Sequence, residues 1–369
     1  GGLIVNNSVE FGIARNAEPH AMALFLNQMQ KLARTPLLVG ADFEQGAAMR
    51  VQFGTPFPHN MAIGATRDTE AAKYEGEVTA RQARALGVHW VFAPVADVNN
   101  NAANPVINNR SFGEDPNEVA KMVAAFIDGA HSDKSRPVLV TAKHFPGHGD
   151  TDVDSHLGLA KLGASRERMD QVELKPFQLA IAHGADAIMT AHMTVPALEP
   201  EEIPATVSPK VLTGLLRNEL KFKGLIVTDA MDMQGLSKLF DGGEAGVRAL
   251  LAGADVLLMP PDPGKTIDAV ESAVKSGRLT TKRIDESLLR VLNAKARAGL
   301  FRSKLVDLNA VSDAINTPDD EKRAQDIADR AVTLVKNDGA AVPLANGRQS
   351  CLVNLVSSRI TRLSLTFAR

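Results

Sequence analysis

Short apolar runs rich in β-branched residues alternate with amphipathic helical stretches along most of this chain, and this alternation restricts its fold more than any other feature. The predicted strands are residues 2–5, 36–42, 88–94, 137–144, 185–192, 224–229 and 254–259. The predicted helices between them include residues 70–86, 116–131, 166–183 and 208–220. Strands separated by helices in this way pair in parallel, with helices covering the sheet. The sequence therefore predicts an α/β fold built on a parallel sheet.

Polar residues gather at the carboxyl ends of the predicted strands. The residues that end or closely follow an apolar run are Asp42, Asp97, Lys143, His144, His192 and Asp229. Periodicity alone allows an open doubly wound sheet or a closed (β/α)8 barrel. In a barrel the carboxyl ends of all strands open onto one face, where active sites lie, so this placement favours a TIM-type barrel. Because the chain opens on a strand, we expect the first barrel strand to be missing from it.

The pattern changes beyond the last amphipathic helix of this alternating part. Residues 303–320 are polar and carry the turn-forming residues of a linker. A further helix and a strand-like run over residues 351–356 follow. We therefore predict a catalytic barrel over residues 1–302, a linker over 303–320, and the truncated beginning of a C-terminal α/β sandwich domain over 321–369.

The composition excludes several classes of function. A formal net charge of -2 gives no electrostatic attraction to nucleic acid or to acidic membranes. No apolar run approaches the roughly 20 residues of a membrane span. The single cysteine, Cys351, cannot form an internal disulfide, and the sequence leaves open whether the protein is cytoplasmic or exported. Aromatic residues make up only 4% of the chain, so we expect a small pocket that binds its ligand by hydrogen bonds.

Residues 143–156 hold the densest group of chemically active side chains. The segment reads Lys-His-Phe-Pro-Gly-His-Gly-Asp-Thr-Asp-Val-Asp-Ser-His and begins at a strand end. Its glycine, proline and aspartate content predicts a loop, and polar loops on the catalytic face of a barrel are usually functional. One histidine here would be an ordinary solvated loop residue, but the whole group of histidines, aspartates and a lysine favours a site.

This segment resembles the signature of the β-N-acetylglucosaminidase branch of family 3 glycoside hydrolases. The resemblance implies that His156 is the general acid/base and that Asp154 orients it. An imidazole titrates near neutral pH, so it can donate a proton to a leaving oxygen and later accept one from water. A carboxylate on its other nitrogen fixes the tautomer and stabilises the imidazolium. Most glycosidases use a second carboxylic acid in this role, so a histidine is a departure from the usual pair.

Asp229 ends a predicted buried strand, where an unpaired carboxylate is costly unless it has partners or a task. The pattern alone also allows an N-cap for the next helix. The strand ends in Thr228-Asp229 and resembles the family's nucleophile region, which ends in Ser/Thr-Asp. The resemblance implies that Asp229 attacks the anomeric carbon and forms a glycosyl-enzyme. Asp232, three residues on, is predicted to be structural.

The same resemblance implies a set of sugar-binding residues. Lys143 and His144 match a pair that hydrogen-bonds ring hydroxyls, and Arg110 lies in an Arg-Ser-Phe loop that reaches the same ring. Asp42 matches an acidic residue that binds distal hydroxyls, although the paired glycines that follow it in the family read Gly46-Ala47 here.

Two further strand-end residues have less specific roles. His192 can line the pocket as a substrate contact or serve packing equally well. Asp97 fits a family motif and is predicted to be structural. The implied enzyme uses no cofactor and no metal, and its partner is an oligosaccharide or small substrate that contains N-acetylglucosamine, drawn from a cell-wall fragment or from chitin.

Three alternatives remain open at this point. A metal-dependent hydrolase could take its ligands from His144, His148, His156, His192 and Asp229, although the chain lacks the early His-x-His pair of barrel metallohydrolases. A sugar-binding module could keep the barrel without the chemistry, although every candidate for nucleophilic attack and proton transfer is retained. A phosphorylase is also possible, because a neutral histidine does not repel phosphate as a carboxylate does.

Overall fold

The computed structural model describes residues 1–5, 17–315 and 317–338. The chain divides into one compact unit, Gly1–Val332, and a second unit, Thr333–Arg369. The strand-like run predicted over residues 351–356, and with it most of the predicted C-terminal domain, lies outside the described residues. The fold and the site below belong to the first unit.

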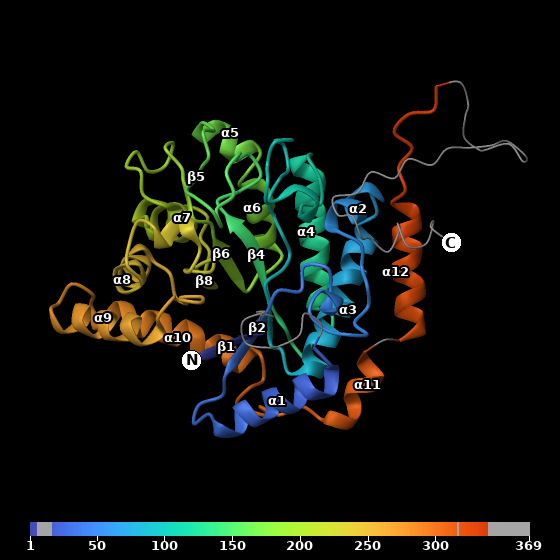
Figure 1. Cartoon of the computed structure of the whole chain (residues 1–369), viewed down its shortest axis with the longest axis horizontal. Coiled ribbons are helices and arrows are strands. Elements are labelled where there is room, and N and C mark those ends of the chain that lie inside the picture. Colours follow the sequence, from blue (N-terminus) through green and yellow to red (C-terminus); the bar gives the residue numbers. More distant parts are fainter. Residues whose placement is uncertain (6–16, 316, 339–369) are drawn as a thin grey trace, which may run out of the picture. The chain divides into compact units, whose positions relative to one another are not determined.

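A six-stranded parallel sheet forms the centre of this unit (Figure 1). In the order in which they pair, the strands are β1 (Gly2–Val5), β2 (Leu38–Ala41), β3 (Trp90–Val91), β4 (Leu139–Phe145), β6 (Ala187–Thr190) and β8 (Leu225–Val227). This is also their order along the chain, so the strand order never reverses as it does in a doubly wound sheet. The parallel sheet predicted from the alternation is confirmed, and it curls as the sheets of TIM-like barrels do.

The last predicted strand, residues 254–259, joins the sheet by a single parallel bridge between Val256 and Val227. Within the part of the chain that the structure describes, no strand pairing links this segment to β1. A small separate pair, β5 (Ala160–Lys161) with β7 (Met193–Thr194), lies beyond the carboxyl ends of β4 and β6.

Alternate residues of the strands face opposite sides of the sheet, as the period of two requires. The side that packs against α10 carries Leu38, Trp90, Leu139, Ala187 and Leu225. The side that packs against the other helices carries Val39, Val91, Val140, Ile188 and Ile226. Both sides are therefore apolar, which explains why these strands read as continuous hydrophobic runs.

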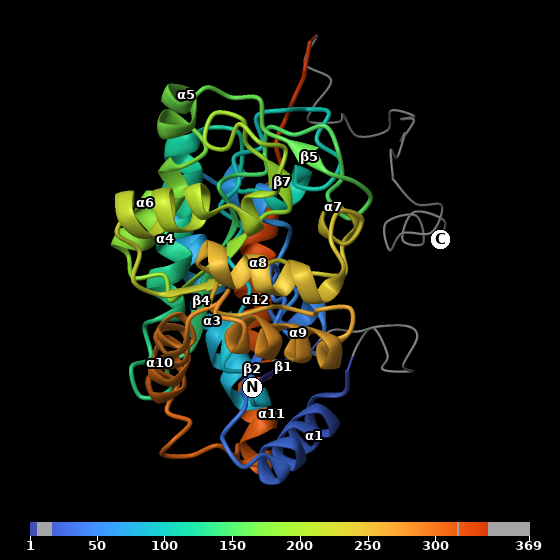
Figure 2. The same cartoon turned by 90° about the vertical axis from the view of Figure 1, so that its left-hand side faces the viewer.

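Helices fill the connections between the strands (Figures 1 and 2). In chain order the helices are α1 (Pro19–Leu32), α2 (Asn60–Ala65), α3 (Thr69–Leu86), α4 (Pro116–Ala130), α5 (Arg166–Gln171), α6 (Lys175–Ala182), η5 (Lys210–Glu219), α7 (Gln234–Ser237), α8 (Gly242–Ala252), α9 (Pro263–Lys275), α10 (Thr281–Arg297), α11 (Val311–Ala314) and α12 (Pro318–Arg330). Single helical turns are η2 (Ala47–Met49), η3 (Asn108–Arg110), η4 (Ala205–Val207) and η6 (Leu308–Ala310). None of the helices in the described residues has both the length and the apolar content of a bilayer span.

Two helix predictions had different outcomes. The single helix predicted over residues 166–183 is wrong, because the segment forms α5 and α6 with a break between them. Pro176 lies in the first turn of α6, where its missing amide hydrogen needs no partner. In one continuous helix the amide of residue 176 would have to donate to Val172, and proline cannot. The start predicted at Ser208 is confirmed, since Ser208 Oγ accepts the Val211 amide at 3.3 Å, as an N-cap does.

Helix α12 belongs to the first unit and is joined to α3 through Asp320. The Tyr74 hydroxyl on α3 donates to Asp320 Oδ1 at 2.5 Å, and Arg81 on the same helix pairs with the other carboxylate oxygen. The helix predicted to open the second domain is thus joined to α3, at the outer surface of the sheet's helical cover.

Candidate active site

A cavity of about 580 Å³ lies at the carboxyl ends of the sheet strands. Its polar lining residues are Asp42, Glu44, Gln45, Arg50, His59, Asn109, Arg110, Lys143, His144, His156, Asp229 and Asp232. Strand ends and the loops that follow them supply this lining, as in barrel enzymes. The sequence-predicted residues that line it are Asp42, Arg110, Lys143, His144, His156 and Asp229.

The cations of the cavity are held by two acidic residues from the end of β2. Lys143 Nζ donates to Asp42 Oδ1 at 2.8 Å and lies 2.6 Å from Glu44 Oε1. Arg110 makes a two-pronged pair with Glu44, with Nε donating at 2.9 Å and Nη2 at 2.8 Å. Such paired contacts fix both the position and the plane of the guanidinium.

Glu44 is only 4% exposed, so its charge matters for the whole network. Burial by itself raises the pKa of the Glu44 carboxyl, but the charges of Arg110 and Lys143 outweigh burial and hold that pKa well below its ordinary value. Glu44 is therefore ionised at neutral pH. The charges of Asp42 and Glu44 raise the pKa of Lys143 against the effect of its burial, so Lys143 stays protonated.

Lys143 and His144 are consecutive, yet both line the cavity. Neighbouring residues of a regular strand point to opposite faces. The register of β4 against β6 shifts between Ala142 and Phe145, which marks a bulge at this point. The Lys143–His144 peptide bond is also cis. The strand is therefore irregular where it carries these two residues, and the alternation of a regular strand does not apply to them.

Asp97 orients His144 from behind the cavity wall. His144 Nδ1 lies 2.7 Å from Asp97 Oδ2, and the amide of His148 donates to Asp97 Oδ1 at 2.6 Å. Nδ1 of His144 therefore carries the proton, and Nε2 accepts from Arg110 at 3.2 Å. Asp97 is fully buried and does not line the cavity, which agrees with the structural role predicted for it.

Asp229 lies just beyond the end of β8 and reaches the cavity. Its Oδ1 accepts the Ala230 amide at 2.8 Å. Burial by itself raises the pKa of Asp229. In the acid range where Asp229 titrates, His144 and His192, with the Ala230 amide and Lys143, outweigh burial and lower that pKa. Asp229 is therefore an ionised carboxylate at neutral pH, which is the form that a nucleophile needs.

His192 lies behind this carboxylate rather than on the cavity surface. Its Nδ1 lies 2.8 Å from Thr206 Oγ1, and its Nε2 lies 3.0 Å from the Ala230 carbonyl oxygen. The side chain is fully buried and is not among the residues that line the cavity. This geometry gives His192 the task of supporting the turn that follows Asp229, and its contact with substrate stays a prediction.

The loop after β4 brings His156 to the cavity wall. His156 Nδ1 lies 2.7 Å from Asp154 Oδ1, and the same oxygen accepts the His156 amide at 2.8 Å. Burial raises the pKa of Asp154, but its hydrogen bonds with His156 outweigh burial and lower it. The ionised Asp154 therefore accepts a hydrogen bond from Nδ1–H of His156. The Nε2 atom of His156, whose side chain is 57% exposed, is left for proton exchange with a ligand.

His148 anchors the same loop from inside. Its Nε2 lies 2.9 Å from Ser155 Oγ and its Nδ1 lies 2.7 Å from Thr151 Oγ1. Burial lowers the pKa of His148, so the ring is neutral and joins the two hydroxyls as one donor and one acceptor. Both ring nitrogens are used within the loop.

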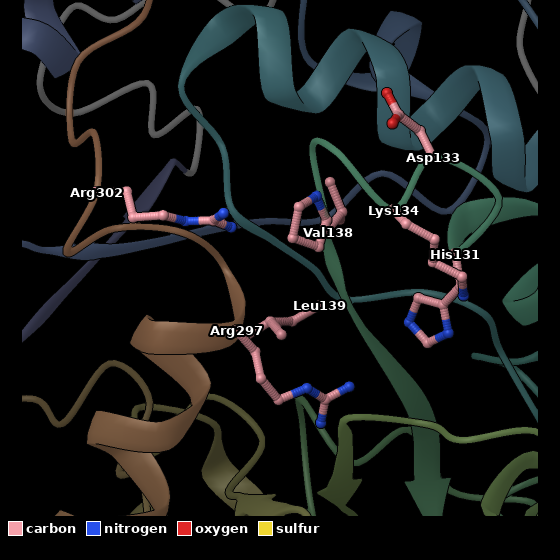
Figure 3. A pocket seen from close by; sticks show the side chains of 8 residues that line it. His131, Asp133, Lys134, Val138, Leu139, Arg297 and Arg302 are labelled. Atoms are coloured by element: carbon pink, nitrogen blue, oxygen red, sulfur yellow. The ribbon is translucent and has the colours of Figure 1, made fainter.

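Three candidate ligands of the metal-dependent alternative, His144, His156 and Asp229, line the same cavity but do not converge on one point. Across the described ranges, no three His, Cys, Asp or Glu side chains converge with the geometry of a metal site. A second cavity, of about 290 Å³, lies near the amino end of β4 and is lined by residues such as His131, Lys134, Arg297 and Arg302 (Figure 3). No residue predicted for the site lies in it.

The sequence of residues 4–294 matches the N-terminal domain of glycosyl hydrolase family 3. This chain belongs to glycosyl hydrolase family 3. The resemblance drawn from residues 143–156 and from the Asp229 region is confirmed at the level of the family.

Three similar proteins show how this family 3 chain compares. A Cellulomonas fimi β-N-acetylglucosaminidase/β-glucosidase is 32% identical, with 88% of this chain and 59% of that protein aligned. The structure of a β-N-acetylglucosaminidase from Paenibacillus sp. FPU-7 is 40% identical with a TM-score of 0.83, covering 88% of this chain and 62% of that one. A β-glucoside phosphorylase structure is 29% identical with a TM-score of 0.85, covering 93% and 66%. The chain thus spans about three fifths of the first two relatives.

Several residues of this family 3 site were missed or given another role by sequence reasoning. Glu44 follows Asp42 by two positions in an extended segment, so the period of two could have placed both on one side. Asp232 was predicted to be structural, yet it is exposed and lines the cavity. Gln45 and His59 meet at 2.6 Å across the cavity wall, and no local signal in the sequence joins them.

Proposed function

We propose that this family 3 chain carries the catalytic barrel of a retaining, exo-acting β-N-acetylglucosaminidase, and that its curled sheet is part of a (β/α)8 barrel. One observation supports this most: Asp229 and His156 line the same cavity as Asp42, Arg110 and Lys143. A nucleophile and a proton donor can therefore act on one sugar. The division into a barrel over 1–302, a linker over 303–320 and a second α/β domain from 321 stays a prediction.

The proposed reaction has two steps. In the first, Asp229 attacks the anomeric carbon while His156 Nε2 gives its proton to the leaving oxygen, so the glycosidic bond breaks and an ester to Asp229 forms. In the second, neutral His156 takes a proton from water, and the hydroxide displaces Asp229 with overall retention. Asp154 holds the imidazolium in both steps, because its carboxylate lies 2.7 Å from Nδ1.

The fixed groups beside Asp229 would hold the sugar ring. The charged Lys143 and Arg110 donate to ring hydroxyls, and Asp42 accepts from them. Two features support N-acetylglucosamine over glucose: the match to the Asp-Ser-His signature with the histidine acid/base that it implies, and the similar Paenibacillus structure, which is named for β-N-acetylglucosaminidase activity alone.

The direct test compares release of an aryl group from a β-N-acetylglucosaminide and from the matching β-glucoside. We expect a higher kcat/KM on the N-acetylglucosaminide, because the chain shares its acid/base signature with that branch of the family. A higher kcat/KM on the β-glucoside would contradict the assigned substrate, and no release from either would contradict the assigned activity.

Phosphorolysis is the second candidate, because one similar structure is a β-glucoside phosphorylase. The charges of the cavity favour water instead. Lys143, Arg110 and Arg50 face Asp42, Glu44 and Asp232 in the lining, and Asp229 adds a fourth carboxylate. The cavity therefore has no excess of positive charge that would attract a phosphate dianion. We expect free N-acetylglucosamine as the product in phosphate buffer and in its absence, and a sugar 1-phosphate would reassign the protein as a phosphorylase.

A further inference from the structure

The first turn of α7 touches the loop that carries His156. The Gly235 amide donates to the Ser155 carbonyl at 3.1 Å, and the Gln234 amide lies 3.3 Å from the His156 carbonyl. Amides in the first turn of a helix have no partner inside the helix. In this protein, two such amides bond the carbonyl groups of Ser155 and His156, which belong to the peptide units on either side of His156.

Gly235 is required by this close approach. A Cβ atom added at this position would lie 2.9 Å from the carbonyl oxygens of Ser155 and Gly158, and 3.0 Å from that of His192. All three are backbone atoms, so no side chain can rotate away to make room. Any residue other than glycine must push the loop or α7 away.

Lys238 adds a third contact to the same loop. Its Nζ donates to the Leu157 carbonyl oxygen at 3.2 Å. The carbonyls of Ser155, His156 and Leu157 are therefore each bonded to the segment 234–238. Through His148, the Ser155 side chain is also fixed from the opposite side.

The same segment is continuous with the candidate nucleophile. Asp229 is followed by a tight turn in which the Met233 amide donates to the Ala230 carbonyl at 3.2 Å. From this turn the chain passes directly into α7. One short stretch thus fixes Asp229 at one end and the backbone of His156 at the other.

We propose that segment 233–238 positions the acid/base relative to the nucleophile, with Gly235 and Lys238 as its positioning residues. The inference rests on the proposed function, since it concerns proton transfer by His156. Neither positioning residue reaches the reacting atoms. Shifting this segment would move His156 while Asp229, held by β8 and the Ala230 amide, keeps its place.

The test uses two substrates that differ in their need for an acid. A disaccharide of β-linked N-acetylglucosamine has a poor leaving group that must be protonated. The dinitrophenolate of the matching dinitrophenyl glycoside departs without protonation. For Gly235→Ala we expect kcat/KM on the disaccharide to fall by about 10²-fold, since displacements near 1 Å have effects of this size. On the dinitrophenyl glycoside we expect a change of less than about threefold.

A matched glycine controls for the substitution itself. At Gly163, which is exposed and has no atom within 4 Å of an added Cβ, alanine should leave both substrates unaffected. If Gly235→Ala lowers kcat/KM equally on both substrates, so that the ratio of the two kcat/KM values is unchanged, the positioning role is overturned.

Lys238→Met provides the second variant, because it is an exposed side chain whose loss cannot prevent folding. Removing one hydrogen bond should lower kcat/KM on the disaccharide alone by up to about tenfold. Lys282→Met on α10, also exposed, is its control. A wild-type chain that is inactive on both substrates would overturn the proposed function. If the wild type is active but each variant loses the same factor on the disaccharide and on the dinitrophenyl glycoside, this inference alone is overturned.

Discussion

The half-buried Asp229 and the buried Glu44 are both carboxylates of the cavity, but their surroundings give them different tasks. Glu44 has two cationic partners within 2.9 Å. Asp229 has one hydrogen bond, from the Ala230 amide, among the contacts of the described residues. A carboxylate whose oxygens are already paired holds other groups in place, whereas one with a free oxygen can attack.

The first residue-scale prediction concerns Asp229→Asn. An amide has no negative charge with which to attack, so turnover should fall by a factor on the order of 10⁴, as it does when a catalytic aspartate is lost. Aryl glycoside hydrolysis measures this, and the circular dichroism spectrum should match that of the wild type. Asp268→Asn, an exposed site on α9, is the matched control and should keep full activity. Near-normal activity in Asp229→Asn would reject the nucleophile assignment.

The second residue-scale prediction concerns Glu44→Gln, which removes the negative charge that pairs with both Lys143 and Arg110. Truncating one partner of a buried ion pair costs about 3 kcal/mol, so the free energy of unfolding should fall by that amount at pH 7. The pKa of Glu44 is lower in the folded protein than its ordinary value of 4.5. The stability that Glu44 contributes is therefore complete above pH 4.5 and is lost as the pH falls through its lower folded value.

Urea denaturation at a series of pH values tests this linkage. The difference in the free energy of unfolding between wild type and Glu44→Gln should be constant above pH 4.5 and should become smaller below it. Glu70→Gln, on the exposed start of α3, should show no gap of this kind. A gap that widens on acidification would show that Glu44 is not held ionised by its partners.

At the scale of elements, α3 and α4 cross so closely that two glycines are needed. An added Cβ at Gly76 would lie 2.1 Å from the Phe126 carbonyl oxygen, and one at Gly129 would lie 1.8 Å from that of Lys73. Small residues allow helix backbones to approach in this way, and the contact fixes the helices that follow β2 and β3. The end of β2 in turn carries Asp42 and Glu44, and the segment after β3 carries Asp97.

We therefore predict that Gly76→Ala lowers the free energy of unfolding by about 2 kcal/mol, the usual cost of overpacking. Gly214→Ala in η5 is the matched control, because its nearest contact to an added Cβ is 3.7 Å. There alanine should stabilise by about 0.5 kcal/mol, since glycine weakens a helix interior. Denaturant unfolding of both variants measures the difference, and equal effects would contradict the close crossing.

The elements also show what the sequence can and cannot predict. Strand positions such as 137–144 and 185–192 were close to β4 and β6, because buried parallel strands are marked by continuous apolar runs. The break before Pro176 was overlooked although proline signals it locally. The pair of β5 with β7 could not be predicted, because each strand is only two residues long.

The candidate site follows the same division. Groups on strand ends, such as Lys143 and Asp229, were predicted because one face of the sheet collects them. The role of Glu44 depends on Arg110, 66 residues away in the chain, and pairings over such distances leave no local trace. The close contact of Gly235 with the backbone of the loop that carries His156 is likewise a tertiary contact, and no pattern in the sequence predicts it.

At the scale of the whole first unit, α12 is fastened to α3 by residues 246 positions apart. Asp320 is 3% exposed and joins Tyr74 to Arg81. Burial raises the pKa of Asp320, but its hydrogen bonds with Thr317 and Tyr74 and its pair with Arg81 outweigh burial and lower it. Asp320 is therefore the ionised centre of the link.

Asp320→Asn should lower the free energy of unfolding by about 3 kcal/mol, because it leaves a buried arginine contact without its charge. Asp319→Asn, at the next position of the same helical turn, is exposed and should change it by less than about 0.5 kcal/mol. Thermal and urea unfolding measure both. Equal stability of the two variants would mean that α12 does not contribute to the first unit through this residue.

The network of Lys143, Asp42, Glu44 and Arg110 has one further consequence for ligands. Its side chains are ordered by one another during folding, so binding does not have to restrict them again, a saving of about 0.5–1.5 kcal/mol for each. Preorganised charged donors are also unforgiving. In the proposed sugar site, a ring that lacks a hydroxyl would leave one of these donors desolvated without its ligand partner, and sites of this kind reject such analogues by a factor on the order of 10⁴. Deoxygenated sugars are therefore the ligands that we expect this cavity to bind least.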